Sequence, residues 1–283
     1  MNRRPLVALL AATGLVLTAC ASSSDSAGEP EASPTAESCT KESLATLEPG
    51  TLTIATGEPA YEPWVKDNAP ESGEGFEAAV AYAVADRLGF TEADIQWVRT
   101  TFDGAIAPGA KTFDWNLQQF TITADREKAV DFSSPYYSAP QAVITNGGSP
   151  IDGATSIEEL KSAKLGAAIG STSLDAAQAV IAPEKDVAVF NDNAAAVSAL
   201  KNGQIDGIVV DLPTAVYLVD VEVEGGKLVG ALSVADDYGI LLGADSPLTA
   251  CTSQAVDELR ADGTLDSLVA EWLDVYTSVP VLG

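Results

Sequence analysis

The sequence predicts an α/β fold with mostly parallel sheets and helices on both faces of each sheet. Two observations predict it: short strand-like apolar segments alternate with segments of helical periodicity, and helix caps or glycines separate the two kinds. The segment 39–283 holds 245 residues, enough for one large domain or two lobes. The order of the elements favours two lobes.

The first elements follow from residue periodicity. Strands are expected at 51–56, at 95–98 and near Trp115. One helix is expected where apolar residues recur every four positions, at Phe76, Val80, Val84 and Leu88. Gly89 ends this helix.

The later elements repeat the same alternation. A capping box at 156–159 begins a helix, and further helices open at 170–173 and cover 194–200, the last one ended by Gly203. Strands are expected at 164–169, 187–190 and 208–210. The strand at 208–210 runs into Asp211, and ligands of open α/β sheets bind beyond the carboxyl ends of the strands.

Arg126 follows a strand that ends in polar residues. Residues 116–120 have the character of a buried strand end, Thr123 of a helix cap, and Arg126 falls in the first turn after it. A guanidinium fork beside backbone N–H groups at a helix start binds a small carboxylate well. The alternative is a surface arginine paired with Asp125 or Glu127.

The N-terminus resembles a bacterial lipoprotein signal. A basic start at 2–4 and an apolar run at 6–17 precede small residues and Cys20. The resemblance implies that residues 1–19 are removed, that Cys20 carries the lipid (palmitate among its acyl chains), and that the protein is anchored to the cell membrane from outside the cytoplasm. Residues 20–38 are expected to form a disordered tether. The alternative is a membrane helix, but the run is shorter than the ~20 residues a span needs.

Charge and composition exclude several functions. Without residues 1–19, which include Arg3 and Arg4, the net charge changes from −26 to −28, so we expect no nucleic-acid partner. The chain has no histidine, which excludes imidazole-based metal sites and Ser-His-Asp catalysis. We expect no cofactor and no metal.

Two cysteines remain once Cys20 is assigned to the lipid. Cys39 and Cys251 would lie in a compartment that permits oxidation, and we predict that they form a disulfide. The alternative is two unpaired thiols.

Nearly the whole chain after residue 49 resembles the solute-binding proteins of ABC importers for polar amino acids. The resemblance is carried, in order, by 50–64, 75–90, 101–106, 122–137, 169–174, 200–215, 238–242 and 259–273. It implies a periplasmic-binding-protein-like (Venus flytrap) fold. Lobe 1 would comprise 39–139 and 237–283, lobe 2 would comprise 140–236, and 138–144 with 235–239 would form the hinge.

The resemblance also implies a ligand site for a free amino acid. Arg126 would bind the α-carboxylate together with the backbone N–H groups of Thr121 and Thr172. Asp211 would bind the α-ammonium group. The alternative for Asp211 is a helix cap before Pro213.

Aromatic and polar positions would surround the ligand's side chain. Tyr61 and Phe102 match the family's two flanking aromatics, with core packing as the alternative. Glu58 replaces the family's usual aspartate, and its charge favours a cationic or amide ligand. Gln118 and Gln119 add amide groups near the strand end, where they either face the ligand or cap the strand. Trp115 either belongs to the core or narrows the pocket, and the pattern assigns no role to Trp64.

The function implied is capture of a polar amino acid by a non-enzymatic, monomeric protein that delivers it to an ABC permease. One alternative is a sensor of the same fold for a signalling partner. Another is a cyclohexadienyl-dehydratase-like enzyme that uses Glu58 or Glu62 as acid or base.

Overall fold

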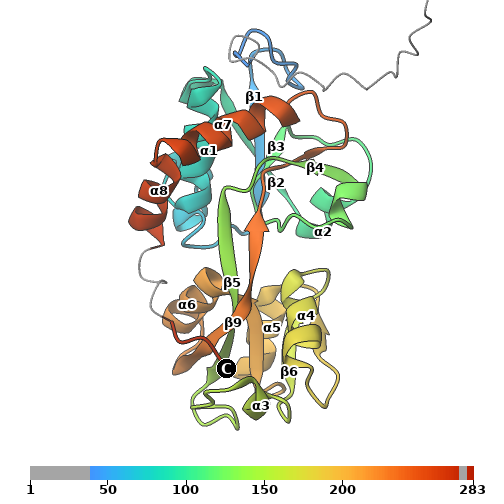
Figure 1. Ribbon diagram of the computed structural model, residues 1–283, viewed down its shortest axis with the longest axis vertical. Coiled ribbons are helices and arrows are strands. Elements are labelled where there is room, and N and C mark those ends of the chain that lie inside the picture. Colours follow the sequence, from blue (N-terminus) through green and yellow to red (C-terminus); the bar gives the residue numbers. More distant parts are fainter. Residues whose placement is uncertain (1–38, 274–278) are drawn as a thin grey trace, which may run out of the picture. The chain divides into compact units, whose positions relative to one another are not determined.

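The computed structural model describes residues 39–273 and 279–283, which form two five-stranded sheets (Figure 1). The first sheet has the order Ile95–Thr100 (β2), Leu52–Gly57 (β1), Trp115–Asn116 (β3), Leu241–Gly243 (β10) and Val130–Phe132 (β4). The second has the order Ala188–Phe190 (β7), Leu165–Ala168 (β6), Gly207–Asp211 (β8), Tyr137–Asn146 (β5) and Gly226–Tyr238 (β9). We call the halves around these sheets lobe 1 and lobe 2. The expected signal peptide, tether and lipid-bearing Cys20 lie outside the described residues.

Both sheets are mixed but mostly parallel, as expected, because in each sheet one strand runs against the other four. β1 is parallel to β2 and β3, and β6 is parallel to β7 and β8. β10 is antiparallel to β3 and β4, and β5 is antiparallel to β8 and β9. In the chain, β5 directly follows β4 of lobe 1, and β10 directly follows β9 of lobe 2. Because no helical crossover precedes β5 or β10, nothing requires either strand to run parallel to its neighbours.

The helices begin and end close to the expected positions. Lobe 1 contains Phe76–Arg87 (α1), Phe102–Ile106 (α2), Thr249–Ala261 (α7) and Thr264–Trp272 (α8), and lobe 2 contains Ile157–Leu160 (α3), Thr172–Ala176 (α4), Asn193–Lys201 (α5) and Leu212–Tyr217 (α6). α1, α7 and α8 pack against one another (Figure 1). The capping box between Ser156 and Glu159 is present at the start of α3, as predicted.

Two long strands connect the lobes. β5 and β9 pair from Tyr137 with Tyr238 to Asn146 with Gly226, and Figure 1 shows them side by side. This pairing contains the expected hinge segment 138–144 and residues 235–238 of the other one. The division into lobes near residues 139 and 237 is a proposal.

The C-terminal residues 279–283 pack against lobe 2 and not against lobe 1, where they were expected. Residues 237–283 were expected in lobe 1, but Val281 bridges Ala231 of β9, and the Ile157 N–H donates to the Gly283 carbonyl at 3.0 Å. Leu282 is 3% exposed and packs in a core cluster of lobe 2. Burial of this one apolar side chain together with backbone pairing places 279–283 on lobe 2.

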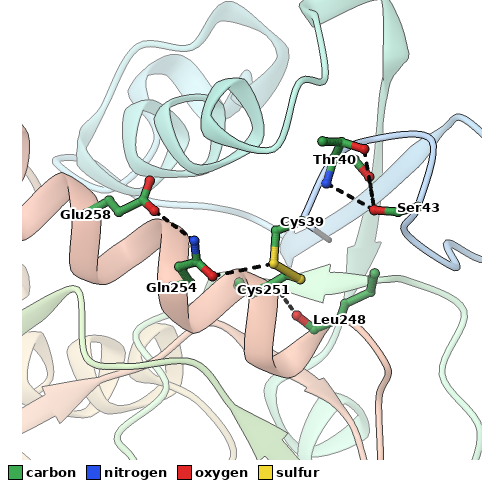
Figure 2. Close-up of a disulfide and its surroundings, with 8 residues drawn as sticks. Cys39, Thr40, Ser43, Leu248, Cys251, Gln254 and Glu258 are labelled. Atoms are coloured by element: carbon green, nitrogen blue, oxygen red, sulfur yellow. Dashed lines mark hydrogen bonds between the residues drawn. A yellow bond between two sulfur atoms is a disulfide. The ribbon is translucent and has the colours of Figure 1, made fainter. Parts of the chain in front are cut away.

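Cys39 and Cys251 form a disulfide, as predicted (Figure 2). Their Cα atoms are 5.3 Å apart, and each residue is 6% exposed. The bond joins the start of the described chain to α7, so both ends lie in lobe 1 and the bond does not restrain the hinge. Across the described ranges, no helix has the length and apolar character needed to cross a membrane.

Candidate functional site

A cleft of about 330 Å³ lies where the carboxyl ends of strands from both sheets meet. Its wall includes the ends of β1, β2, β6 and β8, as expected for α/β sheets. Its volume falls in the range that accommodates a small molecule. All eight residues expected at a ligand site line this one cleft: Glu58, Tyr61, Phe102, Gln119, Thr121, Arg126, Thr172 and Asp211.

Arg126 lies between the two lobes. Its Nη1 donates to the Thr121 carbonyl at 2.7 Å, and its Nη2 donates to the Gly170 carbonyl of lobe 2 at 3.1 Å. Asp125, which was the alternative partner, pairs with Lys128 at 2.6 Å instead. Among the described carboxylates, none lies within salt-bridge distance of the Arg126 guanidinium, so its charge has no counter-ion in direct contact.

The surroundings of Arg126 favour an anionic ligand. Its guanidinium carbon lies 5.2 Å from the centre of the Phe102 ring, which stacks on Phe120 at 4.8 Å. Burial lowers the pKa of Arg126, and the carboxylates of Asp236 and Asp211 offset part of this change. A partly desolvated guanidinium forms stronger charge-assisted hydrogen bonds than one in water.

Gly170 is required by its position beside Arg126. Its φ of +68° is left-handed, and a Cβ there would lie 3.3 Å from Asp103 Oδ1. The carbonyl that accepts from Arg126 therefore depends on a glycine.

Asp211 lies at the end of β8 and also at the N-cap position of α6. Its side chain makes no capping hydrogen bond, although Pro213 stands in the first turn of α6, so the side chain does not act as the expected alternative, a helix cap. Gln141 Nε2 donates to Asp211 Oδ1 at 2.5 Å. Burial raises the pKa of Asp211 to about 6, with Asp236 adding to the rise and Tyr238, Gln141 and Arg126 opposing it.

Thr121 and Thr172 meet across the cleft. Their Oγ1 atoms are 3.1 Å apart, and Thr172 Oγ1 donates to Asp236 Oδ2 at 2.7 Å. Thr121 forms a bridge with Tyr238, but the hydrogen bonds of this bridge come from the neighbouring residues, so the Thr121 N–H is not used in it. Thr172 is the first residue of α4, whose N-cap is Ser171.

The aromatic residues divide between the cleft and the core. Tyr61 lines the cleft, and its ring centre lies 6.2 Å from that of Tyr217 in lobe 2. Trp64 is buried, and its Nε1 donates to Thr214 Oγ1 of lobe 2 at 3.1 Å. Trp115 is 0% exposed within the lobe 1 core, so it is a core residue and does not narrow the pocket.

Glu58 does not supply the free negative charge expected of it. Arg99 Nε lies 3.5 Å from Glu58 Oε2, and Arg99 also donates to the Gly57 and Asn68 carbonyls. Two other acids of the cleft wall, Asp103 and Asp192, form no salt bridge with any residue that the structure describes. The negative charge of the cleft therefore comes from these two residues and Asp211 rather than from Glu58.

The two glutamines have different surroundings. The Gln119 backbone N–H donates to Glu77 Oε1 at 2.7 Å, and its side-chain NH₂ donates to Glu77 Oε2. Gln119 has a φ of +52°, a left-handed conformation that these two bonds help to hold. Gln118 also lines the cleft, and its Oε1 has no hydrogen-bond partner in the described part of the chain. Gln118 is therefore the glutamine whose side-chain oxygen is buried without a partner among the described residues.

Three polar residues near the site were not expected from the sequence: Glu77, Gln141 and Asp236. Glu77 is 1% exposed inside α1, and Gln141 is 0% exposed inside β5. The signal that can find such residues is a polar side chain within an apolar run, as in the segments 76–81 and 139–144. Asp236 has no comparable signal, because residues on both sides of it are exposed or polar.

The chain is similar in sequence to known amino-acid-binding proteins and in fold to a solved one. The chain is 31% identical over 210 residues to the ABC transporter glutamine-binding protein GlnH of Bacillus subtilis, covering 72% of this chain and 75% of that protein. It is 29% identical over 228 residues to the L-cystine-binding protein TcyJ of Escherichia coli K12, covering 80% and 83%. A solved ancestral arginine-binding protein bound to glutamine is 33% identical with a TM-score of 0.66, covering 79% of this chain and 98% of that one.

The solved ancestral protein shares the fold of this chain, and a family model matches residues 52–275, which include every predicted ligand-site residue. The match spans both sheets and both connecting strands. The protein therefore belongs to the bacterial extracellular solute-binding proteins, family 3.

Proposed function

We propose that this protein captures a free polar amino acid, with an amide or cationic side chain, and delivers it to the permease of an ABC importer. The observation that carries the proposal is the pair of opposite charges in the cleft: a half-buried Arg126 without a carboxylate in contact, and Asp211 at the end of β8. An amino acid supplies the complementary α-carboxylate and α-ammonium groups. Relatives that are named for glutamine, cystine and arginine support this ligand class.

Binding is proposed to occur through contacts from both lobes. Arg126 and the Thr121 N–H of lobe 1, with the Thr172 N–H of lobe 2, hold the α-carboxylate, and Asp211 holds the ammonium group. Tyr61 and Phe102 enclose the side chain and exclude water. A ligand that touches both lobes stabilises the closed arrangement, which a permease then recognises. This mechanism requires no covalent chemistry.

The side-chain preference is proposed from the remaining polar groups of the cleft. Asp103 and Asp192 favour a cation, whereas the Gln118 amide of the cleft wall and the Arg99-paired Glu58 favour a neutral amide. Acidic amino acids are disfavoured, because Arg126 is the one cationic side chain of the described cleft wall and the α-carboxylate occupies it. Attachment to the membrane through Cys20 remains part of the proposal.

A thermal-shift screen against the twenty amino acids, followed by calorimetry, tests the proposal. At a ligand concentration one hundred times Kd, binding adds about 2.7 kcal/mol to stability, which raises the melting temperature measurably. NMR of the recovered ligand separates binding from a dehydratase-like reaction, since a binding protein returns the ligand unchanged. No shift with any amino acid contradicts the proposal.

Arg126→Ala is the matched test of the site. We expect it to lower affinity by at least about a hundredfold, because a charge-assisted pair is lost, while the fold is retained. Lys128→Ala removes a positive charge two residues away that pairs with Asp125 outside the cleft, and it should leave affinity unchanged. Near-normal affinity of Arg126→Ala contradicts the proposed site.

A further inference from the structure

Gln141 connects two acidic residues through one amide group. It lies on β5, is 0% exposed, and its Nε2 donates to Asp211 Oδ1 at 2.5 Å and to Asp236 Oδ2 at 2.6 Å. The two carboxylates therefore share one NH₂ group, and their oxygens lie within about 5 Å of each other. At this distance two negative charges strongly influence each other.

Asp236 also holds a threonine of the cleft. Thr172 Oγ1 donates to the same Asp236 Oδ2 at 2.7 Å. Because this bond uses the single hydroxyl hydrogen of Thr172, the Thr121 hydroxyl is the donor in the 3.1 Å contact between the two threonines. A continuous chain of hydrogen bonds thus runs from Thr121 in lobe 1 through Thr172 and Asp236 to Gln141.

Strand register explains how Gln141 reaches both carboxylates. Gln141 pairs directly with Asp211 in the antiparallel ladder of β5 and β8. On its other side, the register between β5 and β9 shifts between Pro140 and Ala142, and such irregularities redirect side chains. Because carboxylates only accept hydrogen bonds, the Gln141 amide must turn its NH₂ group toward Asp211 and Asp236. The Gln141 Oε1 atom on the opposite side has no partner among the described residues.

We propose that Asp236 is a positioning residue for the amino-acid head group, joined to Asp211 by Gln141 and to the carboxylate-binding side of the cleft by Thr172. This role rests on the proposed function. It adds a residue outside the cleft wall to the proposed binding site, since Asp236 is not among the described residues that line the cleft. Asp236 and Gln141 lie on the two hinge strands, so head-group recognition is coupled to the strands that connect the lobes.

Electrostatics give Asp236 a direct effect on both halves of the head-group site. Its carboxylate stabilises the charged form of Arg126 and raises the pKa of Asp211. Tyr238, Gln141 and Arg126 oppose this rise, and the buried Glu77 of lobe 1 is a further carboxylate that interacts electrostatically with Asp211. Removing the Asp236 charge should therefore make Asp211 ionise at lower pH.

The first experiment needs no ligand. Titration of the Asp211 carboxyl carbon by NMR, assigned by its loss in Asp211→Asn, is compared between the unaltered protein and Asp236→Asn. We expect the Asp211 midpoint to move to lower pH in Asp236→Asn. Asp237→Asn, the same change at the next and exposed residue of β9, should leave the midpoint unchanged. An unchanged midpoint in Asp236→Asn overturns the inference.

The second experiment measures binding of L-arginine and L-glutamine by calorimetry. Asp236→Ala should weaken whichever of the two binds by about tenfold or more, and Gln141→Leu should do the same, because each removes hydrogen bonds to a charged group. If both ligands bind, the loss should be equal for both, since Asp236 acts on the head group that they share. Asp237→Ala serves as the control.

The outcomes separate the two proposals. If the unaltered protein binds no amino acid, the proposed function fails, whereas the titration still decides whether Asp236 controls Asp211. If ligand binds and Asp236→Ala binds it with normal affinity while circular dichroism shows a normal fold, the positioning role of Asp236 is wrong and the proposed function stands. A loss confined to one of two bound ligands assigns Asp236 to the side-chain pocket and also overturns the inference.

Discussion

Asp211 is a partly buried carboxylate and Glu77 a fully buried one, and desolvation raises the pKa of Asp211 to about 6 and that of Glu77 to about 7. Their partners differ. Glu77 accepts hydrogen bonds from the Gln119 backbone, the Gln119 amide and the Tyr136 hydroxyl, all within lobe 1. Asp211 lines the cleft and shares the single amide of Gln141 with a second carboxylate.

The difference shows that a raised pKa does not by itself identify a binding group. The lone pairs of Glu77 are used inside the core, where they hold the left-handed backbone of Gln119. Asp211 retains unused acceptor capacity at the cleft wall, and Arg126 opposes the rise in its pKa. The number of hydrogen bonds already made, rather than burial alone, separates the structural carboxylate from the one proposed to bind a ligand.

The largest expected effect is on ligand affinity at Asp211. Asp211→Asn should weaken amino-acid binding by about a hundredfold or more, because the ammonium group loses its counter-charge in a partly desolvated site. The melting temperature of the free protein should not fall, since the lost charge is itself unfavourable in that site. Calorimetry and thermal melting measure the two quantities. Asp237→Asn is the matched control, and a large loss of stability with intact binding would mean that Asp211, like Glu77, has a structural role.

The next largest effect is on stability, at Glu77. Its pKa is raised by folding, so its contribution to stability is complete below about pH 4.5 and is lost as pH rises through about pH 7. The total change is on the order of 3 kcal/mol. Glu77→Gln should remove this part of the pH dependence in urea unfolding measured from pH 4 to pH 8.

A matched variant on the same helix controls the Glu77 experiment. Asp86 is exposed on α1, and Asp86→Asn should keep the pH dependence of the unaltered protein. Identical curves for Glu77→Gln and the unaltered protein would show that Glu77 ionises normally in the folded state.

The smallest effect is expected at Glu58, a third carboxylate that is exposed and paired. Its side chain is 58% exposed and lies beside Arg99, so Glu58→Gln should change affinity by less than about tenfold. Calorimetry with the amino acid found by the thermal-shift screen checks this, with the exposed Glu71→Gln as control. Complete loss of binding in Glu58→Gln would mean that Glu58 contacts a charged group of the ligand despite its pairing with Arg99.

The elements and several site positions follow from local sequence. Periodicity predicted α1 and its buried face, and the capping box predicted the start of α3. The polar end of the strand before it indicated Arg126 as a binding residue. The positions of Tyr61, Phe102 and Thr172 came from the resemblance to a family, and all three line the cleft. Local pattern did not reveal strand direction, since the segments that became β5 and β10 have the same apolar character as parallel strands.

By itself, the sequence determined which segments become strands and helices and which chemical groups stand at the strand ends, and it made Cys39 and Cys251 candidates for a disulfide. These properties depend on side-chain period and residue type within a few positions. Tertiary structure alone decided that Arg99 neutralises Glu58, that Gln119 turns its donors to Glu77, and that 279–283 pack on lobe 2. It also brought Asp236 and Gln141 to Asp211. Such contacts join residues far apart in the chain, and their formation depends on packing and register, which no local pattern encodes.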